Sequence, residues 1–175
     1  MPSAVVATPP GAAGQNSYVT VAEVTAYFDD RPTDDSVWTD ADADDQARAV
    51  LYASKLMDAL FQWTGHAVSE TQGLLWPRYG MYYRNSYYVP SDVIPDELKD
   101  ATAEFAKQLL EADRTDDNAI ETLGLKKLKA GPVALEWDED TAAKVVPDVV
   151  VNLLPDAWYT SIGGRNNAIR DLMRA

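Results

Sequence analysis

Residues 42–63, DADDQARAVLYASKLMDALFQW, predict the longest helix of the chain. Aspartates before and within the first turn suit the positive end of a helix dipole, and Gly65 is expected to close the helix. Small and apolar side chains recur along it at the three-to-four spacing of one buried face. They are Ala47, Val50 or Leu51, Ser54, Met57 and Phe61. This stretch therefore favours a mainly α fold.

A second long helix is predicted in residues 94–113, IPDELKDATAEFAKQLLEAD. Pro95 falls in its first turn, where the missing backbone N–H leaves no helical hydrogen bond unmade. The buried face of this helix is expected to consist of Leu98, Ala101, Phe105 and Leu109. Two amphipathic helices of this length fit a small helical domain.

Shorter elements are predicted on either side of the two long helices. In residues 17–32, SYVTVAEVTAYFDDRP, Thr20 and Glu23 form the capping box of a short helix. Residues 147–159, PDVVVNLLPDAWY, predict a last helix that begins at its leading proline. In between, LGLKKLKAGPVALEWDED (residues 123–140) predicts a β-hairpin, because apolar and polar residues alternate around a Gly-Pro turn.

The predicted fold is mainly α: a small helical bundle with an attached β-hairpin near residues 123–137 and extended N- and C-terminal arms. Residues 1–16 are rich in Pro, Gly and small side chains and are expected to form a flexible arm. Residues 17–157 are expected to form the helical domain, and residues 158–175 a C-terminal tail. No repeat is visible.

The composition restricts the kind of partner. At 175 residues and 46% hydrophobic content, the chain suits one globular domain. Its net charge of −13 disfavours binding of nucleic acid by the whole chain, because such binding depends on cations that neutralise phosphates. Cysteine is absent, and no stretch resembles a signal peptide or a membrane span. We therefore expect a protein that stays in the cytosol, or in a particle assembled there, and has no membrane partner.

The sequence carries no catalytic or metal-binding signature. The aspartates of residues 34–45 lack the Gly and Glu that a calcium loop needs at its sixth and twelfth positions, so a solvated acidic loop is favoured. His66 is the lone histidine and has no nucleophile motif to serve. We expect no enzyme activity, no cofactor and no metal.

The aromatic segment, LLWPRYGMYYRNSYYVPSDVIP (residues 74–95), is the most unusual stretch. A ligand pocket, a platform for stacked bases or a protein-contact surface would each be rich in tyrosine. Base stacking also needs a cationic groove, and the segment supplies only Arg78 and Arg84. Because tyrosine is enriched in protein interfaces, a subunit or neck interface is favoured, formed by Tyr79, Tyr82, Tyr83, Arg84, Tyr87 and Tyr88. Trp76 and Pro77 are expected to pack in the core.

The C-terminal tail, TSIGGRNNAIRDLMRA (residues 160–175), permits two interpretations. Chain ends of mixed polarity commonly fray. Apolar side chains interleaved with arginines are equally typical of a short amphipathic docking peptide. Composition alone leaves both open.

Taken together, these motifs resemble the head–tail connector proteins (adaptor or head-completion proteins) of tailed bacteriophages. The resemblance is to the branch labelled DnaT-like single-stranded DNA-binding protein. It runs through SYVTVAEVTAYFDDR, ASKLMDALFQWTG, QGLLWPRYG, VPSDVIPDELKDATAEFA and LKKLKAGPVALEW, and covers most of residues 17–137. Its most distinctive element is the structural motif Trp76, Pro77, Arg78 and Gly80, at a fixed distance before Pro95.

The resemblance implies a structural virion protein at the phage neck, assembled in the host cytoplasm. Such adaptors form a ring of the same subunit, commonly twelve copies, beneath the portal protein. The ring extends the DNA channel, lets packaged DNA pass without specific binding, and joins the capsid to a neck or tail protein. The implied portal-docking tail is Trp158, Tyr159, Ile162, Arg165, Ile169, Arg170, Leu172 and Arg174.

Two other functions were weighed against the adaptor. A single-stranded DNA-binding protein of phage replication would place Arg78, Arg84 and Lys126 to Lys129 on one face and bind in a salt-sensitive way. A small carboxylate hydrolase would need a pocket with one carboxylate of raised pKa. The sequence offers no motif for the hydrolase.

Overall fold

The structure is a computed structural model that describes residue 6 and residues 8–32, 35–111, 127–130, 133–136 and 145–162. In these residues α-helices dominate, accompanied by three antiparallel sheets of two strands each. The predicted combination of several helices with short antiparallel strands is therefore present. Among the described residues, no helix is both long enough and apolar enough to cross a membrane.

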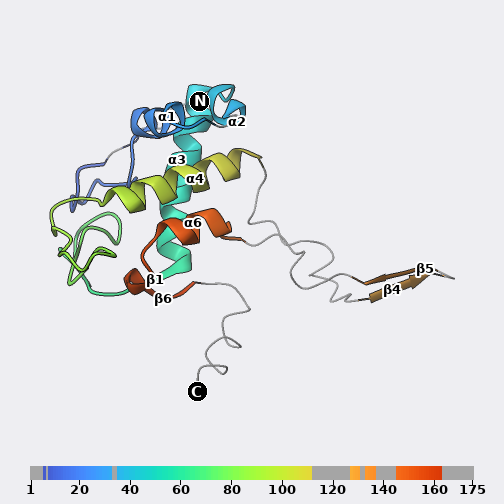
Figure 1. The fold of residues 1–175 in the computed structure, drawn as a ribbon. Helices are drawn as coiled ribbons and strands as arrows, with labels where there is room; N and C mark the ends of the chain where they lie inside the picture. The colour runs from blue at the N-terminus through green and yellow to red at the C-terminus, as the bar shows by residue number, and fades with distance from the viewer. Residues whose placement is uncertain are drawn as a thin grey trace, which may run out of the picture.

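The core is built where two long helices cross (Figure 1). They are α3 (Ala43–Leu60) and α4 (Asp96–Glu111). All residues predicted for the buried face of α4 are buried or packed on the core. The same holds for Ala47, Val50, Ser54 and Met57 of α3. The two helices contact each other through these faces, and α4 also contacts α1, α2 and α6. Helix α4 is therefore the element on which the others pack.

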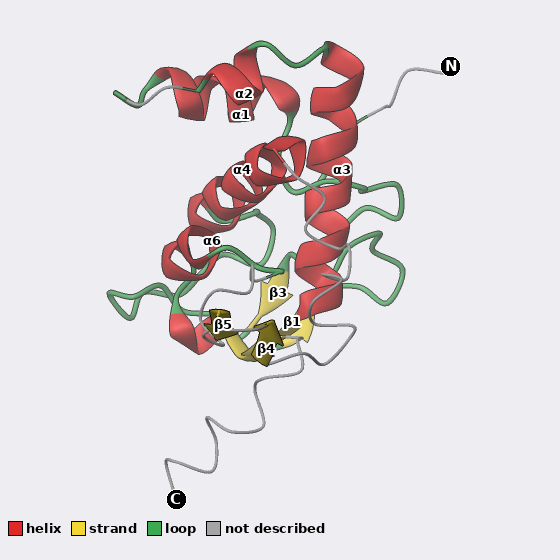
Figure 2. Cartoon of the chain, turned by 90° about the vertical axis from the view of Figure 1, so that its right-hand side faces the viewer, coloured by secondary structure: helices red, strands yellow, loops and turns green. Residues whose placement is uncertain are grey.

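At one end of α3 lie two short helices, α1 (Val21–Asp29) and α2 (Ser36–Thr39) (Figure 2). The capping box predicted for α1 is present, with the Thr20 side chain accepting from the backbone N–H of Glu23. Helix α2 was missed, because its four residues lie inside the acidic segment that was interpreted as a loop. Its Trp38 is fully buried and anchors that segment in the core.

At the other end of α3 the chain turns into strand β1 (Phe61–Trp63), which pairs with β6 (Tyr159–Ile162). The prediction that α3 continues to Trp63 and closes at Gly65 was wrong. The register joins Phe61 to Ile162 and Gln62 to Ser161. A partner almost a hundred residues away thus decides that this aromatic stretch is a strand, and helical periodicity cannot reveal it.

The same pairing corrects the predicted start of the C-terminal tail. After α6 (Asp148–Leu153) the chain forms a short 3-10 helix, η2 (Asp156–Trp158), and then β6. Trp158 is fully buried. Residues 158–162 therefore belong to the folded body, and a docking tail can begin no earlier than residue 163.

The N-terminal arm was also predicted too long. Residues 8–16 lie against the body: Gln15 is buried, and the backbone N–H of Gly73 donates to the carbonyl oxygen of Ala12 at 2.9 Å. A Cβ on Gly73 would lie 2.0 Å from the Gln15 carbonyl oxygen, so only glycine lets the two segments come this close. Val6 packs on the core as well, so residues 8–16 do not form the flexible arm that was predicted.

Two further strand pairs complete the described residues. Strands β2 (His66–Ala67) and β3 (Arg78–Tyr79) form one short ladder. Strands β4 (Lys127–Ala130) and β5 (Val133–Glu136) form the other. This second ladder confirms the strand pairing predicted near residues 123–137. Gly131, Pro132 and Trp137 lie outside the described residues.

Candidate functional site

The tyrosine loop, residues 79–88, forms the most exposed aromatic feature of the described chain. Its backbone folds back on itself: Tyr82 and Tyr88 form an antiparallel bridge, and Val89 N–H donates to the Met81 carbonyl oxygen at 2.9 Å. Four of its rings are largely exposed, with Tyr87 at 72%. The others are Tyr79, Tyr82 and Tyr88. The loop thus presents several aromatic rings on a hydrogen-bonded backbone.

The tip of the tyrosine loop is a tight turn. Tyr83 N–H donates to the Tyr87 carbonyl oxygen at 2.8 Å, and Ser86 N–H donates to the Tyr83 carbonyl oxygen at 2.9 Å. Ser86 has φ +66°, a left-handed backbone conformation that residues other than glycine rarely adopt. Asn85 supports the turn by accepting from Tyr87 N–H. The tip is therefore ordered by local bonds.

The base of the loop is a cluster of buried aromatic rings. Trp76 is fully buried and stands edge-on to Trp63, with ring centroids 5.7 Å apart, and it lies 4.8 Å from Trp158. Pro77, which follows a cis peptide bond, is buried as well. The expectation that both residues pack in the core agrees with their burial. Within the described residues, Trp76 Nε1 is the buried side-chain nitrogen or oxygen atom that lacks a hydrogen bond.

Arg78 is a structural residue in this fold. Its guanidinium donates to three backbone carbonyl oxygens, those of Thr64 at 2.6 Å, Leu75 at 2.9 Å and Gly65 at 3.0 Å. The residue is buried, and burial lowers the pKa of the guanidinium. All three nitrogens of Arg78 hold neighbouring loops together, and the buried side chain is poorly placed to bind a phosphate.

Arg84 is likewise used within the chain. One of its terminal nitrogens, Nη2, donates to the carbonyl oxygens of Asn152 at 2.7 Å, Leu153 at 3.3 Å and Leu154 at 2.8 Å. These are the free carbonyls at the end of α6, where a cation is favourable. Trp158 Nε1 adds a second tie by donating to the Tyr82 carbonyl oxygen at 2.7 Å. The tyrosine loop is thus fastened to the segment that follows α6.

The predicted interface residues therefore divide into two groups. Tyr79, Tyr82, Tyr87 and Tyr88 are exposed. Tyr83 is half-buried and packs on the core, with its ring 6.3 Å from that of Trp158. Of the structural motif, Gly80 adopts φ +80° after β3, and Pro95 accepts the first hydrogen bonds of α4 through its carbonyl oxygen.

Carboxylates surround the base of the tyrosine loop. Burial, followed by the negative charges of Glu97 and Asp96, raises the pKa of Tyr83. Burial and the same two carboxylates raise the pKa of Asp100, one turn further along α4. Two carboxylates at the start of α4 therefore act on Tyr83, at the base of the tyrosine loop.

A buried polar network that the sequence did not indicate holds the loop from beneath. Asp58 of α3 accepts from the Tyr18 hydroxyl, from Trp63 Nε1 at 3.2 Å and from Leu75 N–H at 2.9 Å. Burial raises the pKa of Asp58, although its hydrogen bonds act in the opposite direction. Nothing in the sequence distinguishes this aspartate from its many exposed neighbours.

Almost every cation of the described body has a partner. Apart from Arg78 and Arg84, the ion pairs are Arg31–Glu104, Arg48–Asp44 and Arg48–Asp45, Lys99–Glu23 and Lys99–Asp96, and Lys107–Asp35. Outside the β4–β5 hairpin, Lys55 is the described cation that has no such contact. In the described residues, no group of three or more His, Cys, Asp or Glu side chains could hold a metal ion. In the described body, the paired cations therefore offer the exposed rings little of the positive charge that base stacking requires.

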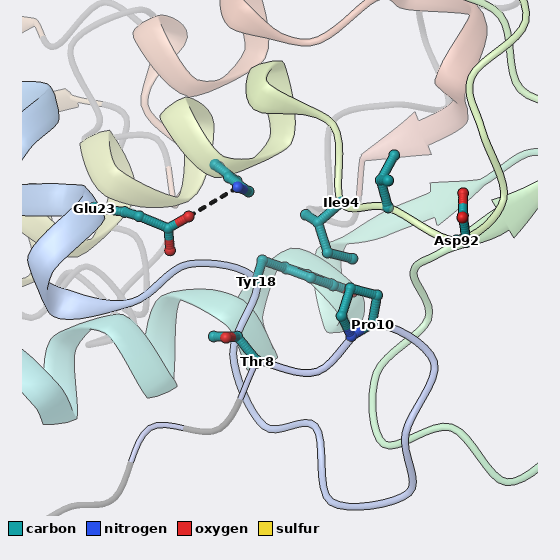
Figure 3. A pocket seen from close by; sticks show the side chains of 8 residues that line it. Thr8, Pro10, Tyr18, Glu23, Asp92 and Ile94 are labelled. Carbon is teal, nitrogen blue, oxygen red and sulfur yellow. Dashed lines mark hydrogen bonds and ion pairs between the residues drawn. The ribbon is translucent and has the colours of Figure 1, made fainter.

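A small cavity of about 290 Å³ lies beside the Glu23–Lys99 ion pair (Figure 3). Thr8 and Pro10 of the N-terminal segment form one of its walls, and Ile94 lies in another. Of the polar groups that line it, Glu23 pairs with Lys99, and the Tyr18 hydroxyl donates to Asp58 outside the cavity. The described lining therefore shows no converging set of ligand-binding groups. We assign no site to it.

Of the residues predicted for portal docking, three lie in the described chain. Trp158 is buried, Tyr159 packs edge-on against Phe61, and Ile162 pairs in β6. These three hold the fold together. The other predicted docking residues lie outside the described residues: Arg165, Ile169, Arg170, Leu172 and Arg174.

Comparison with known proteins gives one match. No curated protein and no solved structure matches the chain. The model of a protein family described as "Putative DnaT-like ssDNA binding protein" matches residues 3–175, which is nearly the whole chain. The chain therefore belongs to the family with that description.

Proposed function

We propose that this protein is a structural head–tail adaptor of a tailed bacteriophage. Its packed helices would form the bundle of a ring subunit, in about twelve copies beneath the portal protein. The ring would extend the DNA channel and join the capsid to the neck or tail of the virion. It would perform no catalysis and need no cofactor.

The observation that carries this proposal is the state of the tyrosine loop. Four rings are exposed, the carboxylates of Asp96 and Glu97 act on Tyr83 at the base of the loop, and Arg78 and Arg84 donate to backbone carbonyls. Exposed tyrosine whose neighbouring arginines donate to backbone carbonyls is suited to contact with protein, where aromatic side chains are frequent hot spots. It is poorly suited to a phosphate backbone.

The overall charge supports the same proposal. With a net charge of −13, the wall of the channel would bind packaged DNA only weakly, because few counterions would be released from the DNA. Only the segment after Ile162 remains for portal docking, and it contains Arg165, Arg170 and Arg174. Its interleaved Ile169 and Leu172 would be the apolar anchors.

The proposal is tested by adding purified protein to DNA-filled, tailless capsids and imaging the portal vertex. We expect new density at one vertex and the subsequent attachment of tails. Deletion of residues 163–175 should abolish vertex binding while leaving the unfolding transition unchanged. Deletion of residues 158–175 should unfold the protein, because it also removes Trp158 and β6. A truncated protein, lacking 163–175, that still caps the portal would show that the tail does not dock there.

Binding of single-stranded DNA is the second candidate. The family description names it, and exposed tyrosines can stack bases. It predicts oligonucleotide binding that weakens steeply with salt. We expect a titration of a fluorescent oligonucleotide at low salt to show no saturable binding. Saturable binding that is lost in the Tyr87→Ala variant would favour this candidate over the adaptor.

A further inference from the structure

The exposed rings of the tyrosine loop are accessible without any change in the fold. Tyr82 and Tyr88 stand edge-on to each other, with ring centroids 5.7 Å apart, and both remain exposed, as does Tyr87. The hydrogen bonds of the turn already fix the backbone that carries these rings, so a partner would have to order little of it on binding. The loop is therefore a preformed aromatic surface.

Exposed carboxylates stand where the chain leaves the loop and enters α4. Asp92 is exposed, and the Asp96 side chain is 92% exposed. Asp96 and its neighbour Glu97 both raise the pKa of Tyr83. Tyr83 belongs to the turn itself, since its backbone N–H donates to the Tyr87 carbonyl oxygen at 2.8 Å. The carboxylates at the start of α4 thus lie within electrostatic reach of the aromatic surface.

The cations of this region are engaged elsewhere. Lys99 Nζ lies 2.8 Å from a Glu23 carboxylate oxygen but 3.9 Å from the Asp96 carboxylate, a separation at which an exposed ion pair contributes little. Arg84 donates to the backbone carbonyls at the end of α6. The start of α4 therefore keeps negative charge that a partner can neutralise.

This combination selects the chemistry of the partner. An ammonium or guanidinium group is attracted to the face of an aromatic ring, and it also pairs with carboxylates. A second copy of the chain fits less well, because it carries the same net charge of −13 and like charges brought together are unfavourable. The surface therefore suits a cationic segment of another protein.

We propose that the tyrosine loop and the first turn of α4 form a docking surface for an arginine- or lysine-bearing segment of a different protein. The cationic groups of that segment would lie over the rings of Tyr82, Tyr87 and Tyr88 and pair with Asp96 and Glu97. The inference deepens the proposed function, because it names the chemistry of the partner that covers the loop. It rests on that function for the place of the partner, which at the vertex would be the portal protein.

A basic peptide tests the docking surface in the isolated protein. The probe is fluorescent hexa-arginine, and the matched probe has citrulline, an uncharged side chain of the same shape, in place of each arginine. We expect saturable binding of the arginine probe and none of the citrulline probe. NMR spectra of the full chain should show the largest shift changes in residues 79–88 and 92–97. Shift changes spread evenly over the protein would overturn the proposal.

Two pairs of carboxylates separate docking at the loop from attraction to the overall charge. Asp96→Asn/Glu97→Gln should weaken the binding of hexa-arginine about fivefold, since both paired carboxylates are lost. Asp29→Asn/Asp30→Asn removes the same charge from exposed positions at the end of α1 and should change binding less than about twofold. Equal weakening by both variants would mean that net charge alone attracts the peptide, and the proposal would fail.

The rings are tested without a change of charge. Tyr87→Ala/Tyr88→Ala should weaken the binding of hexa-arginine about fivefold. Tyr87→Phe/Tyr88→Phe should retain it, because phenylalanine still presents the face of a ring. Tyr52→Ala, at an exposed tyrosine of α3, is the matched control and should leave binding unchanged. Native affinity in the Tyr87→Ala/Tyr88→Ala variant would contradict the docking surface.

Sedimentation of the protein alone tests whether a second copy occupies the surface. The native chain and the Tyr87→Ala/Tyr88→Ala variant should self-associate to the same extent. Self-association that the variant loses would make a second copy the occupant and overturn the proposal.

The docking surface and the adaptor can fail separately. Vertex binding by a protein that does not bind hexa-arginine at the loop would leave the adaptor and remove the docking surface. Peptide binding at the loop without vertex binding would keep the docking surface and remove the adaptor.

Discussion

Two neighbouring stretches of similar composition behave in opposite ways. The stretch from Trp76 to Arg78 is buried, and its arginine is bound to three carbonyl oxygens. The tyrosine loop that follows is also rich in aromatic residues, but four of its rings face solvent. The difference shows that aromatic residues beside arginine can build either a framework or a surface. The arginines do not account for the difference, because Arg84 of the loop also donates to backbone carbonyl oxygens.

The largest expected difference between the two stretches comes from removing one ring from each. Trp76→Ala should lower the free energy of unfolding by about 3–5 kcal/mol, since it leaves a cavity between Trp63 and Trp158. Tyr87→Ala should change it by less than about 0.5 kcal/mol. Chemical denaturation of both variants measures the contrast. Equal destabilisation would mean that the tyrosine loop is also part of the core.

Replacement of Arg78 should likewise cost more unfolding free energy than replacement of Arg84. Arg78→Lys should cost about 2–3 kcal/mol, because one ammonium group cannot satisfy three carbonyls held by a planar fork. Arg84→Lys should cost about 0.5 kcal/mol, since a lysine retains a positive charge near the end of α6. Urea denaturation gives both values. A tolerated Arg78→Lys exchange would contradict the framework role.

The division between core and surface was only partly predictable from the sequence. Signals that act within one turn were reliable: Thr20 and Glu23 cap α1, and Pro95 and Pro147 precede α4 and α6 as expected. Contacts between distant segments were not. Phe61 continued the apolar period of α3, and only pairing with Ile162 makes it a strand.

The predicted site shows the same limit. An interface at these tyrosines was expected because tyrosine is enriched in protein interfaces, and four of the rings are exposed. The hydrogen bonds of Arg84 could not be predicted, because their acceptors lie at the end of α6, about seventy residues further along the chain. Asp58 could not be selected from the acidic residues at all, because its partners come from three separate segments.

Asp58 also allows the framework to be tested through pH. Burial holds its folded-state pKa above the unfolded value of about 3.9. Its contribution to stability is therefore fullest below that unfolded pKa and is lost as pH rises through the folded pKa. Asp58→Asn should remove this loss, and should itself cost about 1–2 kcal/mol by leaving Leu75 N–H unpaired. An unchanged pH dependence of the free energy of unfolding would contradict the assignment.

The smallest expected effect concerns the tip of the tyrosine loop. Ser86→Gly should stabilise the protein by a few tenths of a kcal/mol. Glycine removes the steric cost of the left-handed conformation, but it also loses more backbone entropy on folding than serine does. Ser86→Val should instead be destabilising by about 1–2 kcal/mol. Thermal unfolding measures both. If valine were tolerated, the turn would not be as tightly constrained as the hydrogen bonds indicate.

The central claim is that the tyrosine loop contacts protein and not nucleic acid. The most direct measurement is high-resolution imaging of the portal vertex of tailless capsids after the protein has been added. We predict a ring in which residues 79–88 are covered by a neighbouring protein chain. No ring at the vertex, or a ring in which the exposed tyrosines contact DNA, would contradict the account.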